Sequence, residues 1–325
     1  MNPQRENPDL LVADIGGTNA RFALAREAGA HIELEAVQEL HTADFASLAD
    51  ALRHYLAGIG RAAPTRAVLA VAAPVAGDEI VITNNPWRFS IPQLRQQLQL
   101  AQLRLINDFA AVAYAVTRLP PQHLLALGEV AAPPVRGAEA RYAVLGPGTG
   151  LGVAHLLLRQ HQAIVIETEG GHVGFAPGSA EEREVLRVLL DEFPRVSWER
   201  LLSGPGLVNL YRALATTRGV NAQVLQPAEI TQRAAGGTDA LALHTVELFC
   251  ALLGAFAGDV VLGSGAWDGV YLAGGVTPRL LPWLQKEAFR NRFEAKGRFS
   301  ALLSRVPTQL ITHPHTGLLG AAAAA

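Results

Sequence analysis

Short apolar runs separated by glycine, proline or polar turns recur along the chain and predict strands. Residues 10–13 and 67–72 are two of these runs, and the second has no polar side chain, as expected of a strand covered on both faces. The other predicted strands are residues 21–25, 103–106, 142–145, 153–158, 163–166, 270–273 and 309–312.

Helices are predicted where a capping residue precedes an apolar segment. Ser90 and Ser179 each open a capping box, with Gln93 and Glu182 three residues later, and predict helices that end near residues 98 and 193. Thr42 is expected to cap a helix that ends near residue 56. Further helices are predicted at residues 109–116 and 239–262, and from residues 197, 206, 227, 277 and 317 onward.

The order of strands and helices is similar in the two halves of the chain. This order predicts an α/β protein of two domains with a central cleft. We expect a small α/β domain formed by residues 1–118 and 313–325, and a large α/β domain formed by residues 119–312. Pro120, Pro121 and the segment 130–136, which contains Pro133 and Pro134, are interpreted as connecting segments.

A turn rich in glycine follows the first predicted strand. It brings together Asp14, Gly16, Gly17, Thr18 and Asn19. Glycine lets backbone N–H groups approach an anion closely, the Thr18 hydroxyl adds a donor, and Asp14 can hold Mg²⁺ through water. The turn is therefore a candidate phosphate-binding loop. An ordinary β-turn in which the glycines serve geometry alone is about equally compatible with these residues.

A second glycine turn lies about 130 residues further on, again between two predicted strands. Gly148, Thr149 and Gly150 form it, and Gly152 follows. Neither turn fits the G-x-x-x-x-G-K-[ST] pattern of P-loop proteins, and the second turn also departs from G-x-G-x-x-G. Two similar turns predict two similar domain cores, each of which offers a phosphate loop to a shared cleft.

The composition restricts the class of protein. Half of the 325 residues are hydrophobic and 17% are charged, which predicts a compact globular chain. A net charge of −2 provides no basic surface of the size that nucleic acid requires. The single cysteine, Cys250, excludes an internal disulfide and a multi-cysteine zinc site, and its apolar neighbours predict that it is packed and inert.

No segment predicts export or membrane insertion. Residues 1–8 contain no hydrophobic signal segment, and the apolar stretch 248–263 is short for a span and is interrupted by Asp259. We interpret that stretch as a buried core helix and expect a cytoplasmic protein that does not bind a membrane.

Asp108 is the first candidate for catalysis. With Asn107, it lies between a predicted strand and a predicted helix, where ligands bind in α/β sheets. An aspartate there can accept the proton of a substrate hydroxyl that attacks phosphorus. It can equally cap the helix through Phe109, and spacing alone slightly favours the cap.

Three further residues are candidates for binding a small polar ligand. Glu169 and His172 lie three apart in a loop opened by two glycines, and their side chains suit sugar hydroxyls, although a lone loop histidine is more often structural. Glu199 can be explained as a first-turn acid favoured by a helix dipole. His313 and His315 are too isolated to indicate a metal site.

Seven segments of the chain together resemble the bacterial glucokinase family, the ATP-dependent hexose kinases. They are ADIGGTNAR at residues 13–21, TNNPW at 83–87, INDF at 106–109, GTGLG at 148–152, EGGHV at 169–173, LSGPGLVNLY at 202–211 and LAGGV at 272–276. The resemblance covers residues 11–320 in order. It implies the two-domain actin-like ATPase (ribonuclease H-like) fold with an interdomain cleft.

The resemblance also implies an activity, which is transfer of the γ-phosphate of ATP to the 6-hydroxyl of glucose. Asp108 would be the general base, and Asn107, Glu169, His172 and Glu199 would bind the other hydroxyls of the sugar. The ATP phosphates would lie on two turns, with Mg²⁺ held through water by Asp14 and the adenosine beside two further glycines. The residues implied to bind ATP are Asp14, Gly16, Gly17, Thr18, Asn19, Gly148, Thr149, Gly150, Gly274 and Gly275. A homodimer is expected on the same basis.

Two features of the chain depart from related proteins. Sugar kinases and repressors with the same glycine turns carry a cysteine-rich zinc motif, which a single cysteine cannot supply. The tail, which ends in Ala321–Ala325, is shorter than the closing helix of the family. The residues also leave two other functions open. These are a kinase for another hexose or N-acetylhexosamine, and a sugar-sensing regulator, which would require a DNA-binding module that does not precede Leu10.

Overall fold

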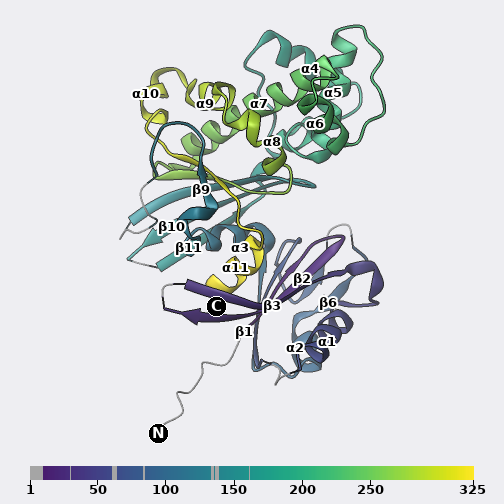
Figure 1. Ribbon diagram of the computed structural model, residues 1–325, viewed down its shortest axis with the longest axis vertical. Helices are drawn as coiled ribbons and strands as arrows, with labels where there is room; N and C mark the ends of the chain where they lie inside the picture. The colour runs from purple at the N-terminus through teal and green to yellow at the C-terminus, as the bar shows by residue number, and fades with distance from the viewer. Residues whose placement is uncertain are drawn as a thin grey trace. The chain divides into compact units, whose positions relative to one another are not determined.

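The computed structural model describes residues 10–29, 31–60, 64–82, 85–132, 135, 139–160 and 162–325. The chain forms two compact units, Met1–Pro121 with His313–Ala325, and Gln122–Thr312 (Figure 1). Residues 1–8, Thr83, Asn84 and the proline pair Pro133–Pro134, on which some of the interpretations above depend, lie outside the described residues.

The first unit contains a five-stranded sheet of order β3-β2-β1-β4-β7. Its strands are β1 (Leu10–Ile15), β2 (Asn19–Ala28), β3 (His31–His41), β4 (Arg66–Val71) and β7 (Gln102–Asn107). β1, β2 and β3 are joined by antiparallel pairing, whereas β1, β4 and β7 are parallel to one another.

The parallel register of this sheet brings together residues that are far apart in the sequence. Ile15 of β1 is opposite Val71 of β4, and Val71 is opposite Asn107 of β7. The carboxyl ends of the three strands therefore meet at one edge of the sheet. The first glycine turn and the Asn107–Asp108 pair leave this edge about 10 Å apart, which is two strand spacings.

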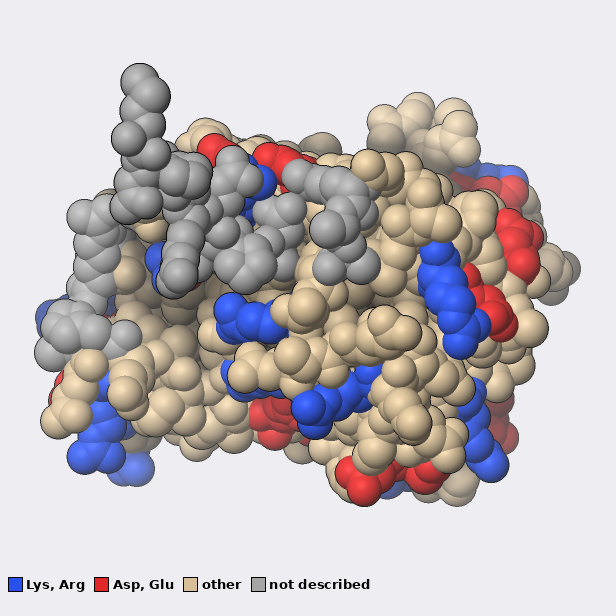
Figure 2. Space-filling view, turned by 90° about the horizontal axis from the view of Figure 1, so that it is seen from below, with Lys and Arg blue, Asp and Glu red and all other residues tan. Residues whose placement is uncertain are grey.

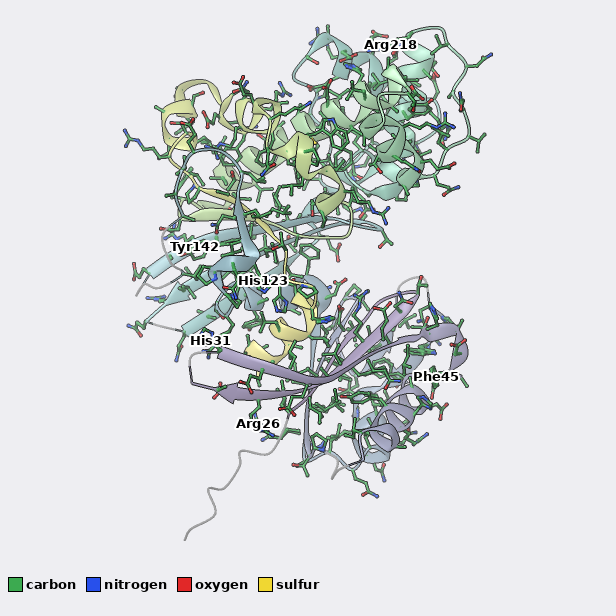
Figure 3. All side chains as sticks on the ribbon, viewed as in Figure 1. Arg26, His31, Phe45, His123, Tyr142 and Arg218 are labelled. Atoms are coloured by element: carbon green, nitrogen blue, oxygen red, sulfur yellow. The ribbon has the colours of Figure 1, made fainter. Side chains whose placement is uncertain are left out.

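Helices and a small hairpin complete the first unit. The helices are α1 (Leu48–Gly58), α2 (Ile91–Gln97), α3 (Asp108–Ala115) and α11 (Thr316–Ala323), and the hairpin joins β5 (Glu79–Val81) to β6 (Arg88–Ser90). A buried cluster around Phe22, Leu52 and Tyr55 forms the core between α1 and the sheet. In Figure 3 the labelled Phe45 lies close to α1, where its ring contacts that of His54.

Two expectations about helix caps in this unit are wrong. Thr42 belongs to a short 3-10 helix, Thr42–Asp44, and α1 begins at Leu48 with Ser47 as its cap. Ser90 does precede α2, but its side chain makes no capping hydrogen bond. The proline in the first turn of α2 removes one donor that such a cap would satisfy.

The second unit repeats the strand scheme of the first in a six-stranded sheet of order β11-β10-β9-β12-β13-β8. Its strands are β8 (Leu124–Ala126), β9 (Glu139–Pro147), β10 (Leu151–Arg159), β11 (Gln162–Thr168), β12 (Gly269–Leu272) and β13 (Thr308–Ile311). As in the first unit, an antiparallel series, β9-β10-β11, is extended by parallel strands, β12 and β13. The predicted similarity of the two halves is confirmed.

The helices of the second unit lie on one face of this sheet (Figure 1). They are α4 (Ala180–Leu190), α5 (Gly204–Thr217), α6 (Pro227–Ala235), α7 (Ala240–Ser264), α8 (Thr277–Leu284), α9 (Glu287–Glu294) and α10 (Ser300–Leu303). Short 3-10 helices occur at Gly170–His172, Trp198–Arg200 and Gly297–Phe299. The helix expected from Ser197 onward is therefore only the 3-10 helix Trp198–Arg200. Helix α4 ends at Leu190, three residues before the predicted end at Phe193.

The long apolar helix α7 is the centre of the second core. By length and hydropathy it could cross a membrane, but 67% of its most apolar window is buried within the protein. Phe249, Cys250 and Phe256 are among its buried residues, and they pack with Trp198 and with α9. This packing confirms the interpretation of the segment as a core helix.

The charged side chains are dispersed. On the face drawn in Figure 2, Lys and Arg side chains lie beside Asp and Glu side chains. Ion pairs such as Arg53–Asp50 and Arg21–Glu39 are examples of this arrangement in the first unit.

Candidate functional site

The first glycine turn joins β1 to β2 and keeps its own geometry through a backbone hydrogen bond. The Gly16 N–H donates to the Asn19 carbonyl oxygen at 2.9 Å. Thr18, at the tip, is exposed, whereas Gly16, Gly17 and Asn19 are half-buried. The turn thus presents a hydroxyl at its exposed tip.

Two residues from other segments hold the carbonyl groups of this turn. The buried Thr42 hydroxyl lies 3.0 Å from the carbonyl oxygens of Gly17 and Thr18, and the Thr42 N–H donates to Thr18 at 2.9 Å. The Asn85 side-chain amide also donates to the Gly17 carbonyl, at 3.2 Å. With its acceptors occupied in this way, the turn is suited to bind an anion through its remaining N–H groups. The sequence did not indicate this role for Thr42.

Asp14 lies at the carboxyl end of β1, and its side chain is 24% exposed. Burial raises the pKa of this carboxyl group, and the positive charge of Arg21, with Nη1 3.7 Å from Oδ2, opposes part of that effect. His315 lowers the pKa of Asp14 slightly further. A nearby cation would compensate the cost of keeping the carboxylate ionised there.

Asn107, and not Asp108, is the N-cap of α3. The Asn107 Oδ1 accepts hydrogen bonds from the Phe109 and Ala110 N–H groups at 2.8 and 3.2 Å, while its Nδ2 donates to the Ala73 carbonyl at 3.3 Å. Asp108 is the first helical residue, and its Oδ1 also accepts from the Phe109 N–H at 2.8 Å. The interpretation that Asp108 caps the helix therefore applies mainly to Asn107.

The second glycine turn is fixed by two other segments of the second unit. Within the turn the Gly148 N–H donates to the Gly150 carbonyl at 2.8 Å, and the first residue of α5, Gly204, donates to the Gly148 carbonyl at 2.8 Å. Gly274 lies against the strand that enters the turn, since a Cβ at 274 would be 2.4 Å from the Pro147 carbonyl oxygen. The candidate phosphate turn and the candidate adenosine residues are therefore neighbours.

Glu169, His172 and Glu199 converge in the second unit. The imidazole of His172 lies between the two carboxylates, with Nε2 3.8 Å from Glu169 and Nδ1 3.8 Å from Glu199. All three side chains are partly exposed, Glu199 the least at 29%. Two carboxylates and an imidazole around one point form a set of donors and acceptors suited to a polyhydroxyl ligand.

Glu199 also links this cluster to the second glycine turn. Its Oε2 accepts a hydrogen bond from the Leu151 N–H at 2.9 Å, and a Cβ at position 150 would be 2.6 Å from the same oxygen. The explanation of Glu199 as a first-turn acid is therefore incomplete, because its carboxylate is engaged by the turn. Ser203 supports it by donating to the Glu199 carbonyl at 2.8 Å while capping α5.

The family model described as Glucokinase matches residues 11–325. The chain belongs to the glucokinase family. It is 52% identical to the Glucokinase of Stenotrophomonas maltophilia (strain K279a) over 316 residues, which is 97% of this chain and 94% of that protein. The resemblance stated from the motifs is confirmed.

Solved structures extend the glucokinase likeness to three dimensions. The crystal structure of a glucokinase from an Antarctic psychrotroph is similar with a TM-score of 0.89 and 38% identity, and the match covers 98% of each chain. A ROK family glucokinase from Streptomyces griseus, solved in complex with glucose and AMPPNP, is similar in fold, with a TM-score of 0.65, 18% identity and 98% and 99% coverage. The predicted two-domain actin-like ATPase fold is confirmed.

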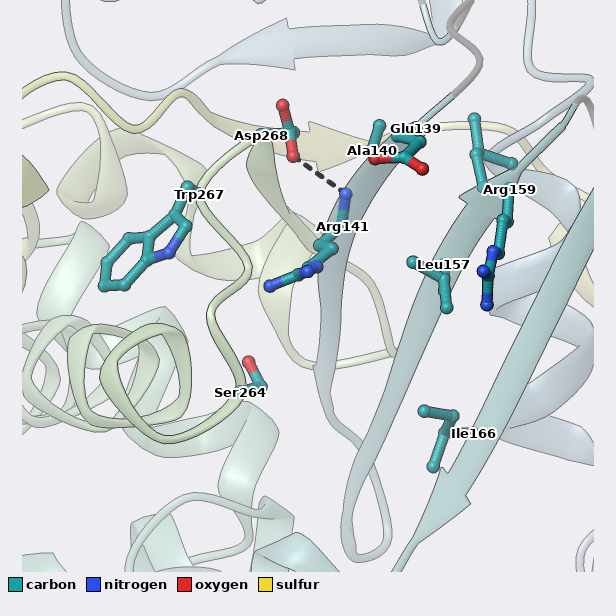
Figure 4. A pocket seen from close by; sticks show the side chains of 10 residues that line it. Glu139, Ala140, Arg141, Leu157, Arg159, Ile166, Ser264, Trp267 and Asp268 are labelled. Atoms are coloured by element: carbon teal, nitrogen blue, oxygen red, sulfur yellow. Dashed lines mark hydrogen bonds between the residues drawn. The ribbon is translucent and has the colours of Figure 1, made fainter.

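A separate cavity lies away from the residues predicted from the glucokinase motifs (Figure 4). Arg141, Arg159, Trp267 and Asp268 are among the residues that line it, and the Arg141 N–H donates to Asp268 at 2.8 Å. It is at the end of the β9–β10 hairpin opposite the glycine turn, about 27 Å along the strand. None of the predicted site residues lines this cavity.

No cluster of three or more His, Cys, Asp or Glu side chains suited to a metal ion occurs in the part of the chain that the structure describes. Within residues 14–19, which form the first glycine turn, Asp14 is the one acidic side chain. This fits an ion whose other ligands are water and phosphate oxygens, as is usual for Mg²⁺ bound with a nucleotide.

Proposed function

We propose that this protein is an ATP-dependent glucokinase, which transfers the γ-phosphate of ATP to the 6-hydroxyl of glucose and forms glucose 6-phosphate and ADP. Membership of the glucokinase family makes the chain a sugar kinase, and hence a phosphotransferase that uses ATP. The observation that carries the proposal at the level of residues is the position of Asp108. It is the first residue of α3, directly after β7, at the edge of the sheet that also carries the first glycine turn.

In this proposal Asp108 is the general base. Its carboxylate accepts the proton of the 6-hydroxyl as that oxygen attacks the γ-phosphorus, the bond to the ADP oxygen breaks, and ADP leaves. Phosphoryl transfer requires mainly alignment and neutralisation of charge, so the rest of the site has to position the sugar and the triphosphate.

Asn107, Glu169, His172 and Glu199 are proposed to bind the remaining hydroxyls of the sugar. The convergence of Glu169, His172 and Glu199 within hydrogen-bonding reach of one small ligand supports this assignment. A sugar that lacks one of these hydroxyls would leave a polar partner unpaired, at a cost of about 1–3 kcal/mol.

The two glycine turns are proposed to hold the phosphates of ATP, and Gly274 and Gly275 to lie beside the adenosine. The residues assigned to the phosphates are Gly16, Gly17, Thr18, Asn19, Gly148, Thr149 and Gly150. Asp14 would hold Mg²⁺ through water, and the ion would neutralise the charge of the triphosphate. The exposed Thr18 hydroxyl and the contact of Gly274 with the second turn support these assignments.

The test is Asp108→Asn, with Asp50→Asn as its matched control. Asp50 is likewise an acid in the first turn of a helix in the same unit. We expect Asp108→Asn to lower turnover at least about a hundredfold while the dissociation constant for glucose, measured by calorimetry, stays within about threefold. The control should retain its turnover. Near-normal turnover of Asp108→Asn would remove this residue from the base role.

We further propose that the protein acts in the cytoplasm as a homodimer, without binding nucleic acid or a membrane. The net charge of −2 and the buried core position of α7 support the last two parts, and the homodimer is proposed on the resemblance to the glucokinase family alone. Light scattering of the purified chain should give twice the mass of 34.5 kDa. A monomer at micromolar concentration would contradict the homodimer.

A further inference from the structure

The C-terminal helix α11 packs against two elements that carry proposed site residues. It contacts β1, which ends at the first glycine turn, and α3, which begins with Asp108. Leu318, Leu319 and Ala321 are buried in these contacts, so the short tail forms an integral part of the first unit. In Figure 1, α11 is the yellow helix beside β1 and α3.

Gly317 brings α11 into contact with Asp14. A Cβ placed on Gly317 would lie 2.6 Å from both Cγ and Oδ2 of Asp14. Real Cβ atoms essentially never approach other atoms so closely, and any side chain at position 317 would have to displace the carboxylate. Gly317 therefore sets one wall of the space that this carboxylate occupies.

Gly320 brings the same helix into contact with α3. A Cβ at this position would lie 1.7 Å from the carbonyl oxygen of Ala111 and 2.4 Å from its carbonyl carbon. These are backbone atoms, which cannot rotate away, so the two helices would have to separate. Ala111 is one turn after Asp108, and a shift of α3 at this point would carry Asp108 with it.

Glycine at these two positions is explained by these contacts and not by backbone conformation. Neither residue has a positive φ. Glycine is also a poor helix former, so its presence twice in an eight-residue helix requires a reason. The spacing of three places both glycines on one side of α11, toward β1 and α3.

We propose that Gly317 and Gly320 are positioning residues for phosphoryl transfer, Gly317 for the Asp14 carboxylate and Gly320 for the general base Asp108. The proposal rests on the function proposed above. It predicts two different defects, because Asp14 is assigned to Mg²⁺·ATP and Asp108 to the chemical step.

The experiment compares Gly317→Ala and Gly320→Ala with Gly58→Ala in the full-length chain. Gly58 is the last residue of α1 in the same unit, and a Cβ there would meet no atom within 4 Å. Each variant is assayed for turnover, and for binding of a non-hydrolysable ATP analogue by calorimetry with Mg²⁺ and with EDTA.

For Gly317→Ala we expect the affinity for the Mg²⁺ complex of the analogue to fall on the order of tenfold, the usual effect of disturbing a support of a metal ligand. Binding in EDTA should be unchanged. For Gly320→Ala we expect turnover to fall by on the order of a hundredfold, since a displacement of about 1 Å can have that effect. Gly58→Ala should match the parent chain in both assays.

Double variants separate positioning from general loss of structure. Adding Gly317→Ala to Asp14→Asn, or Gly320→Ala to Asp108→Asn, should cause little further loss, because each glycine acts through its aspartate. Additive losses would overturn the proposal. The new Cβ of Gly317→Ala would clash only with the Asp14 side chain, which can rotate, so we expect this variant to fold. If Gly320→Ala does not fold, Gly317→Ala tests the positioning proposal on its own.

The two proposals fail in distinguishable ways. If Asp14→Asn and Asp108→Asn keep full activity, the assignments under the proposed function are wrong. If those variants lose activity while both glycine variants behave like Gly58→Ala, only the positioning role is wrong.

Discussion

Glu199 provides a prediction that separates its two contacts, because one carboxylate serves both the sugar cluster and the second glycine turn. Its Oε2 accepts from the Leu151 N–H at 2.9 Å, and its Oε1 lies 3.8 Å from His172. Glu199→Gln keeps an oxygen that can accept from Leu151 but removes the charge. Glu199→Ala removes both the charge and the acceptor.

The magnitudes follow from these contacts. A hydrogen bond to a charged group contributes about 1.5–3 kcal/mol, which corresponds to a factor of roughly 10 to 150 in affinity. Leu151 is buried, so removing the acceptor of its N–H should destabilise the ordered conformation of the turn by about 1–3 kcal/mol. We therefore expect Glu199→Gln to weaken glucose binding about tenfold and leave the binding of the ATP analogue within about threefold.

Glu199→Ala should weaken glucose binding at least as much, and should weaken binding of the ATP analogue about tenfold as well. Calorimetry with each ligand separately measures both effects. The control is Glu192→Ala, which removes an exposed glutamate of the same unit that pairs with Arg212 at 3.0 Å. Unchanged affinity of Glu199→Ala for the analogue would refute the reasoning that this carboxylate orders the phosphate turn.

Three further predictions concern stability and reactivity. Thr42→Val should lower the free energy of unfolding by about 0.5–1.5 kcal/mol, since it removes the hydroxyl donor while the Gly17 and Thr18 carbonyls keep the Asn85 amide and the residue-42 N–H as donors, and an unchanged urea midpoint would be evidence against this. Asp14→Asn should raise the free energy of unfolding near pH 7, because burial raises the pKa of Asp14 above 3.8 and so penalises its charged form. This gain should shrink as the pH of the urea titration approaches 3.8, and a gain independent of pH would contradict it. Burial also raises the pKa of the Cys250 thiol, so a thiol reagent such as dithionitrobenzoate should react only after denaturation, and rapid labelling of the native chain would show that the core is open.

The place of the candidate residues Asn107 and Asp108, between a strand and a helix, could be predicted from the sequence, but which of them caps α3 could not. Asn107 and Asp108 follow an apolar strand directly, and such polar pairs mark the ligand edge of an α/β sheet. Both residue types are good N-caps, so the sequence cannot tell which of them caps the helix. The backbone decides, since Asn107 has extended dihedrals and Asp108 is helical.

The supports of the first glycine turn were missed for a different reason. Thr42 reaches the turn through β3, a strand that was not predicted. β3 alternates apolar and polar residues only as far as Ala36, which has a φ of 51° and shifts the pattern. Thr42 and Gly17 are also 25 residues apart in the sequence, so local propensity could not connect them.

Gly317 and Asp14 are even further apart in the sequence than Thr42 and Gly17, and the sequence offered only a weak indication of their contact. Gly317 and Gly320 are three residues apart, which places them on one side of a helix, where the missing Cβ atoms let another element approach closely. This spacing does not identify the partners, which are set by the fold of the first unit.

The most direct test of the central claim is the initial rate of ADP formation with Mg²⁺·ATP and glucose, compared with mannose, fructose and N-acetylglucosamine. We expect glucose to give the highest kcat/KM, and the phosphorus NMR spectrum of the product to show a phosphate coupled to the protons on carbon 6. A higher kcat/KM for any of the other three sugars, or no ADP formed with glucose, would contradict it.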